Sequence, residues 1–177
     1  MHDVVLAGLG ADFPATTERL TLVQREQKHA DAEGGSATEL SAMLSAEVPQ
    51  SWPPPFVSAP VGGEGVTWRN QYVIHTAGGE RPTLIGLSGV ARWPAEERMI
   101  QVGCGVVPEY HGRRIGEEVV GALATWALSQ PDVDRVFCDI PEDHVASAKS
   151  LERAGYSKAD EVPSVGFVRF VKRRTGA

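Results

Sequence analysis

Residues 106–118 combine the residue types that a chain uses to bind an anion. They read Val-Val-Pro-Glu-Tyr-His-Gly-Arg-Arg-Ile-Gly-Glu-Glu and lie between apolar stretches at 99–107 and 119–128. This pattern predicts a strand that ends shortly before a helix begins. The first turn of such a helix exposes unpaired N–H groups at the positive end of the helix dipole. We therefore expect an anion the size of a pyrophosphate to bind there.

Glycines and cationic side chains in this segment strengthen the interpretation. Gly112 and Gly116 leave room for a phosphate, while Arg113, Arg114 and His111 add positive charge. The segment is not a nucleotide-triphosphate loop, because the Gly-x-x-x-x-Gly-Lys-Ser/Thr pattern is absent from it. An ordinary turn with solvated arginines remains the alternative interpretation.

The N-terminal stretch 4–12, Val-Val-Leu-Ala-Gly-Leu-Gly-Ala-Asp, begins like a dinucleotide-binding strand and loop. The third glycine of that motif would fall at Phe13, and Pro14 follows, where it would disrupt the first turns of the required helix. We therefore expect residues 1–15 to be an N-terminal arm and residues 16–177 to form a single domain.

The hydrophobic pattern predicts helices and strands in an order that defines the fold class. Alternation predicts a strand at 19–23, which a helix follows, and apolar spacing predicts a helix at 38–48 with Leu40, Met43, Leu44 and Val48 on one face. Three strands joined by short turns suggest an antiparallel meander. The remaining predicted elements, in order, are strands at 71–75, 83–93 and 99–107, a helix at 115–128, a strand at 135–140, a helix at 143–154 and a strand at 165–171. This order predicts an α+β or mixed α/β sandwich.

Composition limits the classes of partner. The chain has 177 residues, 42% of them hydrophobic, with no apolar run long enough to span a membrane, so we expect a soluble protein that does not bind membranes. The formal charge of -6 and the lack of a basic block argue against nucleic acid. Cys104 and Cys138 have neither metal-ligand spacing nor a disulfide pattern, which suggests buried thiols, a cytoplasmic location and no bound metal. The N-terminus shows no export signal.

Three segments, taken in order, resemble one known family. The first is Val-Gly-Cys-Gly-Val-Val-Pro-Glu-Tyr-His-Gly-Arg-Arg-Ile-Gly at 102–116, and the second is Asp-Ile-Pro-Glu-Asp-His-Val-Ala-Ser-Ala-Lys-Ser-Leu-Glu-Arg-Ala-Gly-Tyr at 139–156. Thr-Glu-Arg-Leu-Thr-Leu at 17–22 and Trp-Pro-Pro-Pro at 52–55 add to the likeness. Together they resemble the GNAT N-acetyltransferases, and within them the ribosomal-protein N-terminal acetyltransferases.

The resemblance implies a fold, a cosubstrate and a set of contacts. The fold would be a central, largely antiparallel sheet with splayed middle strands, flanked by helices. Acetyl-CoA would bind without a metal, and the Val106 N–H would hold the thioester carbonyl as it becomes an oxyanion. The residues that the resemblance assigns to cosubstrate binding are Val106, His111, Gly112, Arg113, Arg114, Ile115, Gly116, His144 and Ser147.

The sequence departs from the family pattern at four of the relevant positions. His111 stands where relatives have Arg or Gln, and His144 stands where they have Asn. Arg114 replaces the middle glycine of the loop, so we expect its side chain to point out of the cradle. Gln101 occupies the place of a strand Glu suspected of activating the amine, and Gln cannot accept a proton.

Ser147 is the candidate acid that protonates the departing thiolate. Many GNAT enzymes place a tyrosine on the last helix for this task, and the matching residue here is Leu151. Ser147 lies one helical turn before Leu151, on the same face. The alternative is that Ser147 only hydrogen-bonds the helix backbone or the pantetheine arm.

Two functions remain open from the sequence. The first is an acetyl-CoA-dependent N-acetyltransferase that transfers an acetyl group directly to a primary amine, either a peptide N-terminus or a small molecule. The second is a non-catalytic module of the same fold that binds or senses acyl-CoA. The protein would be a monomer or a homodimer, and the loop Trp52–Pro55 would be either a wall of the acceptor pocket or a surface turn.

Overall fold

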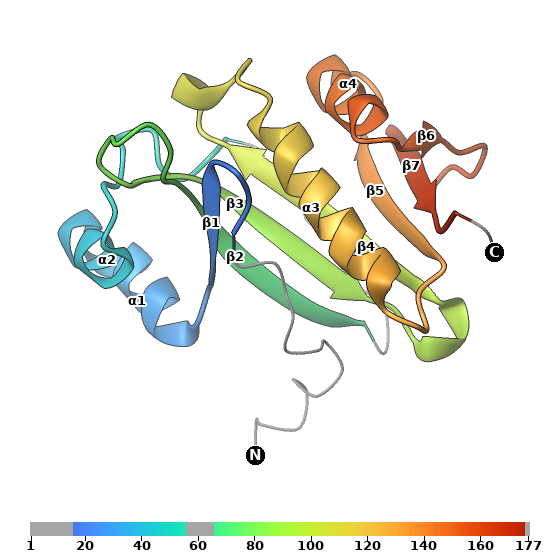
Figure 1. Cartoon of the computed structure of the whole chain (residues 1–177), viewed down its shortest axis with the longest axis horizontal. Coiled ribbons are helices and arrows are strands. Elements are labelled where there is room, and N and C mark those ends of the chain that lie inside the picture. The colour runs from blue at the N-terminus through green and yellow to red at the C-terminus, as the bar shows by residue number, and fades with distance from the viewer. Residues whose placement is uncertain (1–15, 56–65, 176–177) are drawn as a thin grey trace.

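The computed structural model describes residues 16–55 and 66–175 of the chain (Figure 1). The expected N-terminal arm at 1–15, with its dinucleotide-like stretch, lies outside the described residues. The same holds for the glycine-rich connection at 62–65. The prediction of a single domain at 16–177 stays a prediction.

The described strands form one seven-stranded sheet in the order β1-β2-β3-β4-β5-β7-β6. Its members are β1 (Leu20–Gln24), β2 (Thr67–His75), β3 (Thr83–Arg92), β4 (Met99–Val106), β5 (Arg135–Pro141), β6 (Ser157–Lys158) and β7 (Phe167–Arg173). Every neighbouring pair is antiparallel except β4 and β5, which are parallel. The predicted meander of β2, β3 and β4 is confirmed, and the fold is the expected mixed α+β, GNAT-like one.

Helices cover both faces of the sheet. Helices α3 (Ile115–Ser129) and α4 (Val145–Arg153) lie over β4 and β5 on the side that faces the viewer in Figure 1. Helices α1 (Gln27–Gly35) and α2 (Ala37–Leu44) lie near the β1 edge. Among the described residues, no helix is both long and apolar enough to cross a membrane.

Alternation along the strands divides the buried apolar residues into two clusters. Val73 of β2 belongs to the larger cluster, with α3, whereas its neighbours Tyr72 and Ile74 belong to the smaller one, with α2. Adjacent strand residues point to opposite faces, so each face of the sheet has its own core. Trp52, in the loop after α2, packs against both clusters.

The predicted helix at 38–48 is too long at its C-terminal end. Helix α2 ends at Leu44, and Ser45 follows in the left-handed conformation with φ 51°. The backbone of Glu47 instead pairs with the start of β3. Its N–H donates to Pro82 O at 2.7 Å, and its carbonyl accepts from the Leu84 N–H at 2.8 Å. Pairing with the start of β3 therefore overrides the helical tendency of residues 46–48.

The face predicted for this helix is also partly wrong. Leu40 and Leu44 are buried, but the Met43 side chain is 37% exposed. Val48 does pack against the smaller cluster, although it does so from the loop. Leu40 and Leu44 lie four residues apart on the buried side of α2. Met43 lies about 100° around the helix from Leu44, and its side chain reaches the surface.

Candidate functional site

The central strands β4 and β5 diverge shortly after they pair. Their shared register covers only residues 99–101 of β4, although both strands continue beyond it. The Val107 N–H donates to Ile85 O on β3 at 2.8 Å. Because neighbouring residues of a strand direct their backbone groups to opposite sides, the Val106 N–H and C=O face the gap beside β5. The predicted oxyanion donor therefore points into the space between the diverging strands.

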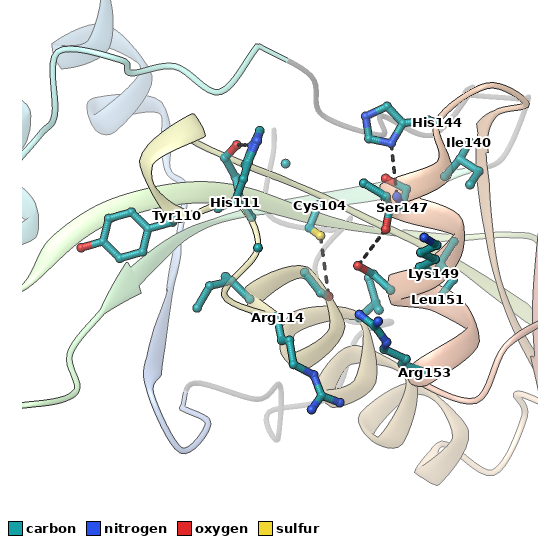
Figure 2. Close-up of a pocket in the computed structure, with 18 of the residues that line it drawn as sticks. Cys104, Tyr110, His111, Arg114, Ile140, His144, Ser147, Lys149, Leu151 and Arg153 are labelled. Atoms are coloured by element: carbon teal, nitrogen blue, oxygen red, sulfur yellow. Dashed lines mark hydrogen bonds between the residues drawn. The ribbon is translucent and has the colours of Figure 1, made fainter.

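A cavity of about 410 Å³ lies at this gap, under the first turns of α3 and α4 (Figure 2). Its described lining consists of Pro55, Cys104, Gly105, Val106, Tyr110, His111, Gly112, Arg114, Ile115, Gly116, Val120, Cys138, Ile140, His144, Ala146, Ser147, Lys149, Ser150, Leu151 and Arg153. The strands contribute its apolar floor, and the two helices with the loop before α3 contribute its polar rim.

Most of the site residues inferred from the sequence meet around this cavity. The described lining includes Val106, His111, Gly112, Arg114, Ile115, Gly116, His144 and Ser147. Arg113 is not among the described lining residues. Its guanidinium lies 4.6 Å from the centre of the Tyr110 ring, and its carbonyl accepts a hydrogen bond from Arg19 Nη1 at 3.1 Å.

The cavity has a positive rim. Arg114, Lys149 and Arg153 line it, and no aspartate or glutamate is found among the described lining residues. Ile115 and Gly116 bring the first turn of α3 to the same wall, where backbone N–H groups lack helical partners. Although the whole chain has a formal charge of -6, this part of its surface attracts anions.

The loop before α3 uses left-handed backbone at two positions. Gly112 has φ 76°, and Arg114, the N-cap residue of α3, has φ 60°. The Arg114 side chain points away from Ser147 and His144 (Figure 2) and forms two hydrogen bonds with Glu117, at 2.8 and 2.6 Å. These bonds hold the pKa of Glu117 below its ordinary value. Arg114 replaces the middle glycine of the family loop, and its side chain, held by Glu117, does not cover the loop backbone.

His111 is tied to the residue that carries the predicted oxyanion donor. Its Nε2 lies 2.8 Å from the Val106 carbonyl oxygen. A carbonyl can only accept, so the ring carries its proton on Nε2 and donates it. The contact fixes the loop against the end of β4, on the same side of the strand as the Val106 N–H.

His144 is the N-cap residue of α4. Its Nδ1 accepts a hydrogen bond from the Ser147 N–H at 3.3 Å. Within the part of the chain that the structure describes, no group hydrogen-bonds the Ser147 hydroxyl. The neighbouring Ser150 differs, because its hydroxyl donates to Ala146 O at 3.0 Å within the helix. Ser147 therefore lines the cavity with a hydroxyl that no described backbone group of the helix bonds.

Two other groups near the cavity are poor proton donors or nucleophiles at neutral pH. Burial raises the pKa of the Cys104 thiol to about 12. Burial also raises the pKa of Tyr156 well above its ordinary value, and the Tyr156 hydroxyl donates to Val120 O at 3.1 Å. A thiolate at Cys104 is therefore scarce, and Tyr156 serves the packing of α3.

Gln101 belongs to the other face of the sheet. It is 3% exposed, and its Oε1 has no hydrogen-bond partner among the residues that the structure describes. Cys104 and Val106 direct their side chains into the cavity, so alternation places Gln101 on the opposite side of β4. It lies at the last position where β4 pairs with β5, in register with Phe137.

Lys149 and Arg153 were not predicted as site residues from the sequence. Both are on α4, four residues apart, and both line the cavity. The i, i+4 spacing is a signal for a shared helical face, but on an exposed helix it is also typical of solvated charge. From the sequence, the loop Trp52–Pro55 could be either a pocket wall or a surface turn. The structure places Pro55 in the cavity wall.

Residues 20–157 match the family model described as acetyltransferase (GNAT) domain. The chain is similar to a Vibrio cholerae protein assigned as a ribosomal-protein-serine acetyltransferase, with 15% identity and a TM-score of 0.61 over 92% of this chain and 98% of that one. It is also similar to RimL, a ribosomal L7/L12 α-N-protein acetyltransferase solved with coenzyme A, with 14% identity and a TM-score of 0.59 over 91% and 97% of the two chains.

A third similar structure is a GNAT-family acetyltransferase from Bacillus anthracis, with 16% identity and a TM-score of 0.58 over 90% of this chain and 98% of that one. Curated protein sequences give no significant match. Because the family model covers well over half of its length, the chain belongs to the GNAT acetyltransferase family. Its enzyme class is that of an N-acetyltransferase, and the similar solved structures share its fold.

The cap that His144 provides leads to a stability prediction. Replacing His144 with Ala removes the acceptor for the Ser147 N–H, and we expect the free energy of unfolding to fall by about 0.5–2 kcal/mol. His144→Asn should retain most of the stability because the Asn side-chain oxygen is a good cap. Urea denaturation measures both. An Asn variant as unstable as the Ala variant would show that capping is not the contribution of His144.

Proposed function

We infer that the cavity between β4 and β5 binds acetyl-CoA and that the protein transfers its acetyl group directly to a primary amine. The observation that carries this inference is the cavity itself, which is lined by a cationic rim, by the first turn of α3 and by Val106, whose N–H is directed away from β3. A ligand that carries both phosphates and a thioester matches these features.

The phosphates would be held at the rim. The first turn of α3 offers backbone donors, and Gly112 adds no side chain to the approach. Lys149 and Arg153 on α4 add positive charge across the cavity. Arg114 is already paired with Glu117, so we expect a smaller direct contribution from it than from the two cations of α4.

The thioester would lie at the open end of the gap. The Val106 N–H, directed away from β3, would donate to the carbonyl oxygen as negative charge develops on it. The His111 contact with the Val106 carbonyl holds this part of the strand in place. The raised pKa of Cys104 argues for direct transfer, since an acyl-cysteine intermediate would need a thiolate.

The departing CoA thiolate would take its proton from Ser147. Ser147 lines the cavity, and no described group of the helix bonds its hydroxyl, whereas the Ser150 hydroxyl donates to Ala146 O. Leu151 lines the same wall one turn later and cannot donate a proton. We assign Ser147 as the acid because it has a hydroxyl that no described group of the helix bonds, whereas Leu151 has no proton to donate.

The acceptor is a primary amine of a peptide N-terminus or a small molecule. The similarity to ribosomal-protein acetyltransferases supports a peptide N-terminus as the first acceptor to test. Gln101 cannot remove the proton from the amine, so a water chain to a more distant base would complete the reaction. Buried or half-buried cysteines suit a reducing compartment, which is consistent with a cytoplasmic location.

Turnover of acetyl-CoA with a panel of amines tests the proposal. The panel would contain peptides with different N-terminal residues together with polyamines and aminoglycosides, and mass spectrometry would detect the acetylated product. We expect at least one amine to gain an acetyl group with release of CoA. Binding of CoA without any acetylated product would instead favour the non-catalytic acyl-CoA-binding module, for which the Gln101 substitution is the supporting observation.

Gly116→Val should weaken CoA binding by about tenfold or more, because a phosphate close to the helix leaves no room for a branched side chain. A Cβ at Gly116 would lie 3.7 Å from Cys104 Sγ and 3.9 Å from Ser150 Oγ, so Gly116→Ala should be tolerated. Gly121→Val in the same helix is the control, since a Cβ there meets nothing within 4 Å. Isothermal titration measures the Kd. Equal affinities for the two valine variants would remove the first turn of α3 from the binding site.

Ser147→Ala should lower kcat and kcat/KM together by roughly 100-fold, with little change in CoA affinity, as expected for an acid used in the transition state. Ser147→Thr keeps the hydroxyl and should retain most of the activity. Steady-state kinetics and titration with CoA are the measurements. A near-normal kcat in the Ala variant, or a loss of CoA binding in proportion to activity, would leave Ser147 as a binding residue only.

A further inference from the structure

The first turn of α3, where an anion should bind, contains two carboxylates, although neither belongs to the described lining of the cavity. Glu117 and Glu118 follow Gly116 directly. Acidic residues at a helix N-terminus stabilise the helix through its dipole. For a pyrophosphate at the same helix end, however, each free carboxylate is a like charge that opposes binding. A working anion site therefore needs both charges to be neutralised.

Glu117 is neutralised by the loop itself, through its pair of hydrogen bonds with Arg114. Glu118 has its partners elsewhere in the chain. Arg19, which immediately precedes β1, donates through Nε at 2.7 Å and its Nη2 lies 2.6 Å from the same carboxylate oxygen, Oε2. The residues that neutralise Glu118 thus come from a segment about a hundred positions earlier in the sequence.

The other carboxylate oxygen of Glu118 is also occupied. Oε1 accepts from the Arg19 backbone N–H at 3.1 Å and from the Thr17 hydroxyl. The side chain of Glu118 is 17% exposed. Burial by itself raises the pKa of Glu118, but the hydrogen bonds from Thr17 and Arg19 outweigh it and hold the pKa below its ordinary value. Glu118 is therefore ionised at neutral pH and depends on Arg19 for its counter-charge.

Arg19 also contacts the loop before α3, which is part of the proposed anion site. Its Nη1 donates to the Arg113 carbonyl at 3.1 Å, one residue before the N-cap of α3. One guanidinium therefore holds both the loop backbone and the helix carboxylate. This double contact suggests two possible roles, one in the shape of the loop and one in its charge.

We propose that Arg19 is a positioning residue for the cosubstrate, which masks the Glu118 carboxylate so that the first turn of α3 remains an anion site. The inference rests on the proposed binding of acetyl-CoA at this turn. It predicts that the charge of residue 19 matters more than its hydrogen bond to the loop. It also predicts that the need for Arg19 disappears when Glu118 is made neutral.

A double-mutant cycle with titration of CoA tests this inference. Arg19→Gln keeps a donor for the Arg113 carbonyl but loses the charge, and we expect its Kd to rise about 5- to 10-fold. Arg19→Lys keeps the charge and should stay within about twofold of the wild type. Glu118→Gln alone should bind CoA as well as the wild type. Arg19→Gln combined with Glu118→Gln should regain wild-type affinity to within about threefold.

Arg25→Ala is the matched control. Arg25 forms an ion pair with Glu33 whose two side chains are 30% and 18% exposed, close to the 34% and 17% of Arg19 and Glu118. It lies outside the described lining of the cavity. Losing it should leave the Kd unchanged, which separates a local effect from the loss of any half-buried ion pair. Thermal melts of every variant identify those that fail to fold.

Salt gives an independent readout of the same proposal. The affinity defect of Arg19→Gln should shrink as the ionic strength rises from about 50 to about 500 mM, because added ions partly screen the repulsion between the partly buried Glu118 carboxylate and an anion at the solvent-facing rim. A defect caused by loop shape would not depend on salt in this way. This measurement needs only one folded variant.

Three outcomes would overturn the inference while leaving the proposed function intact. They are wild-type affinity in Arg19→Gln, a double variant as weak as Arg19→Gln alone, and an affinity defect that does not change with salt. Failure of the wild-type protein to bind CoA would instead overturn the proposed function. The two failures are distinguishable because the wild type is titrated first.

Discussion

The site depends on one constraint, namely that β4 and β5 stop pairing after residue 101. A parallel pair that continued would use the backbone groups of both strands and fill the gap with side chains. Because the strands diverge, the Val106 N–H and C=O face a cavity, and such groups require a partner. His111 supplies one for the carbonyl. The helices α3 and α4 then close the gap from one side and bring their first turns to its edge (Figure 1).

Charge at this edge is balanced between the stability of α3 and the binding of a ligand. Glu117 and Glu118 favour the helix, since carboxylates in the first turn interact well with its dipole. The same charges oppose an anion. Partner arginines resolve the conflict, because Arg114 and Arg19 hold the carboxylates in ion pairs and leave the cations of α4 to set the sign of the cavity. An acidic protein can therefore contain a cationic site without a basic sequence block.

The local features of the fold were predictable from the sequence, and the long-range ones were not. Short turns and alternation located β2, β3 and β4 within a few residues, because the segments between these strands contain the turn residues Gly78, Gly79 and Pro94. Helix α2 was predicted too long because no local signal shows that Glu47 pairs with the start of β3. In the sequence, Lys149 and Arg153 are typical of solvated surface charge. Only the placement of α4 beside α3 shows that they line the cavity. Arg19 and Glu118 are 99 positions apart, so their pairing needs the folded chain.

The contact between residues 17–19 and α3 bears on how this chain can be divided into parts. The family match begins at residue 20, and a fragment cut there would keep every described residue that lines the cavity. It would nevertheless lose Thr17 and Arg19, which complete the surroundings of Glu118. A boundary drawn from sequence similarity marks shared ancestry, whereas the physical unit here extends at least to Thr17. The N-terminal boundary of a shortened or transplanted domain is best chosen to keep the ion pair of Glu118 with Arg19 intact, rather than placed where the family match begins.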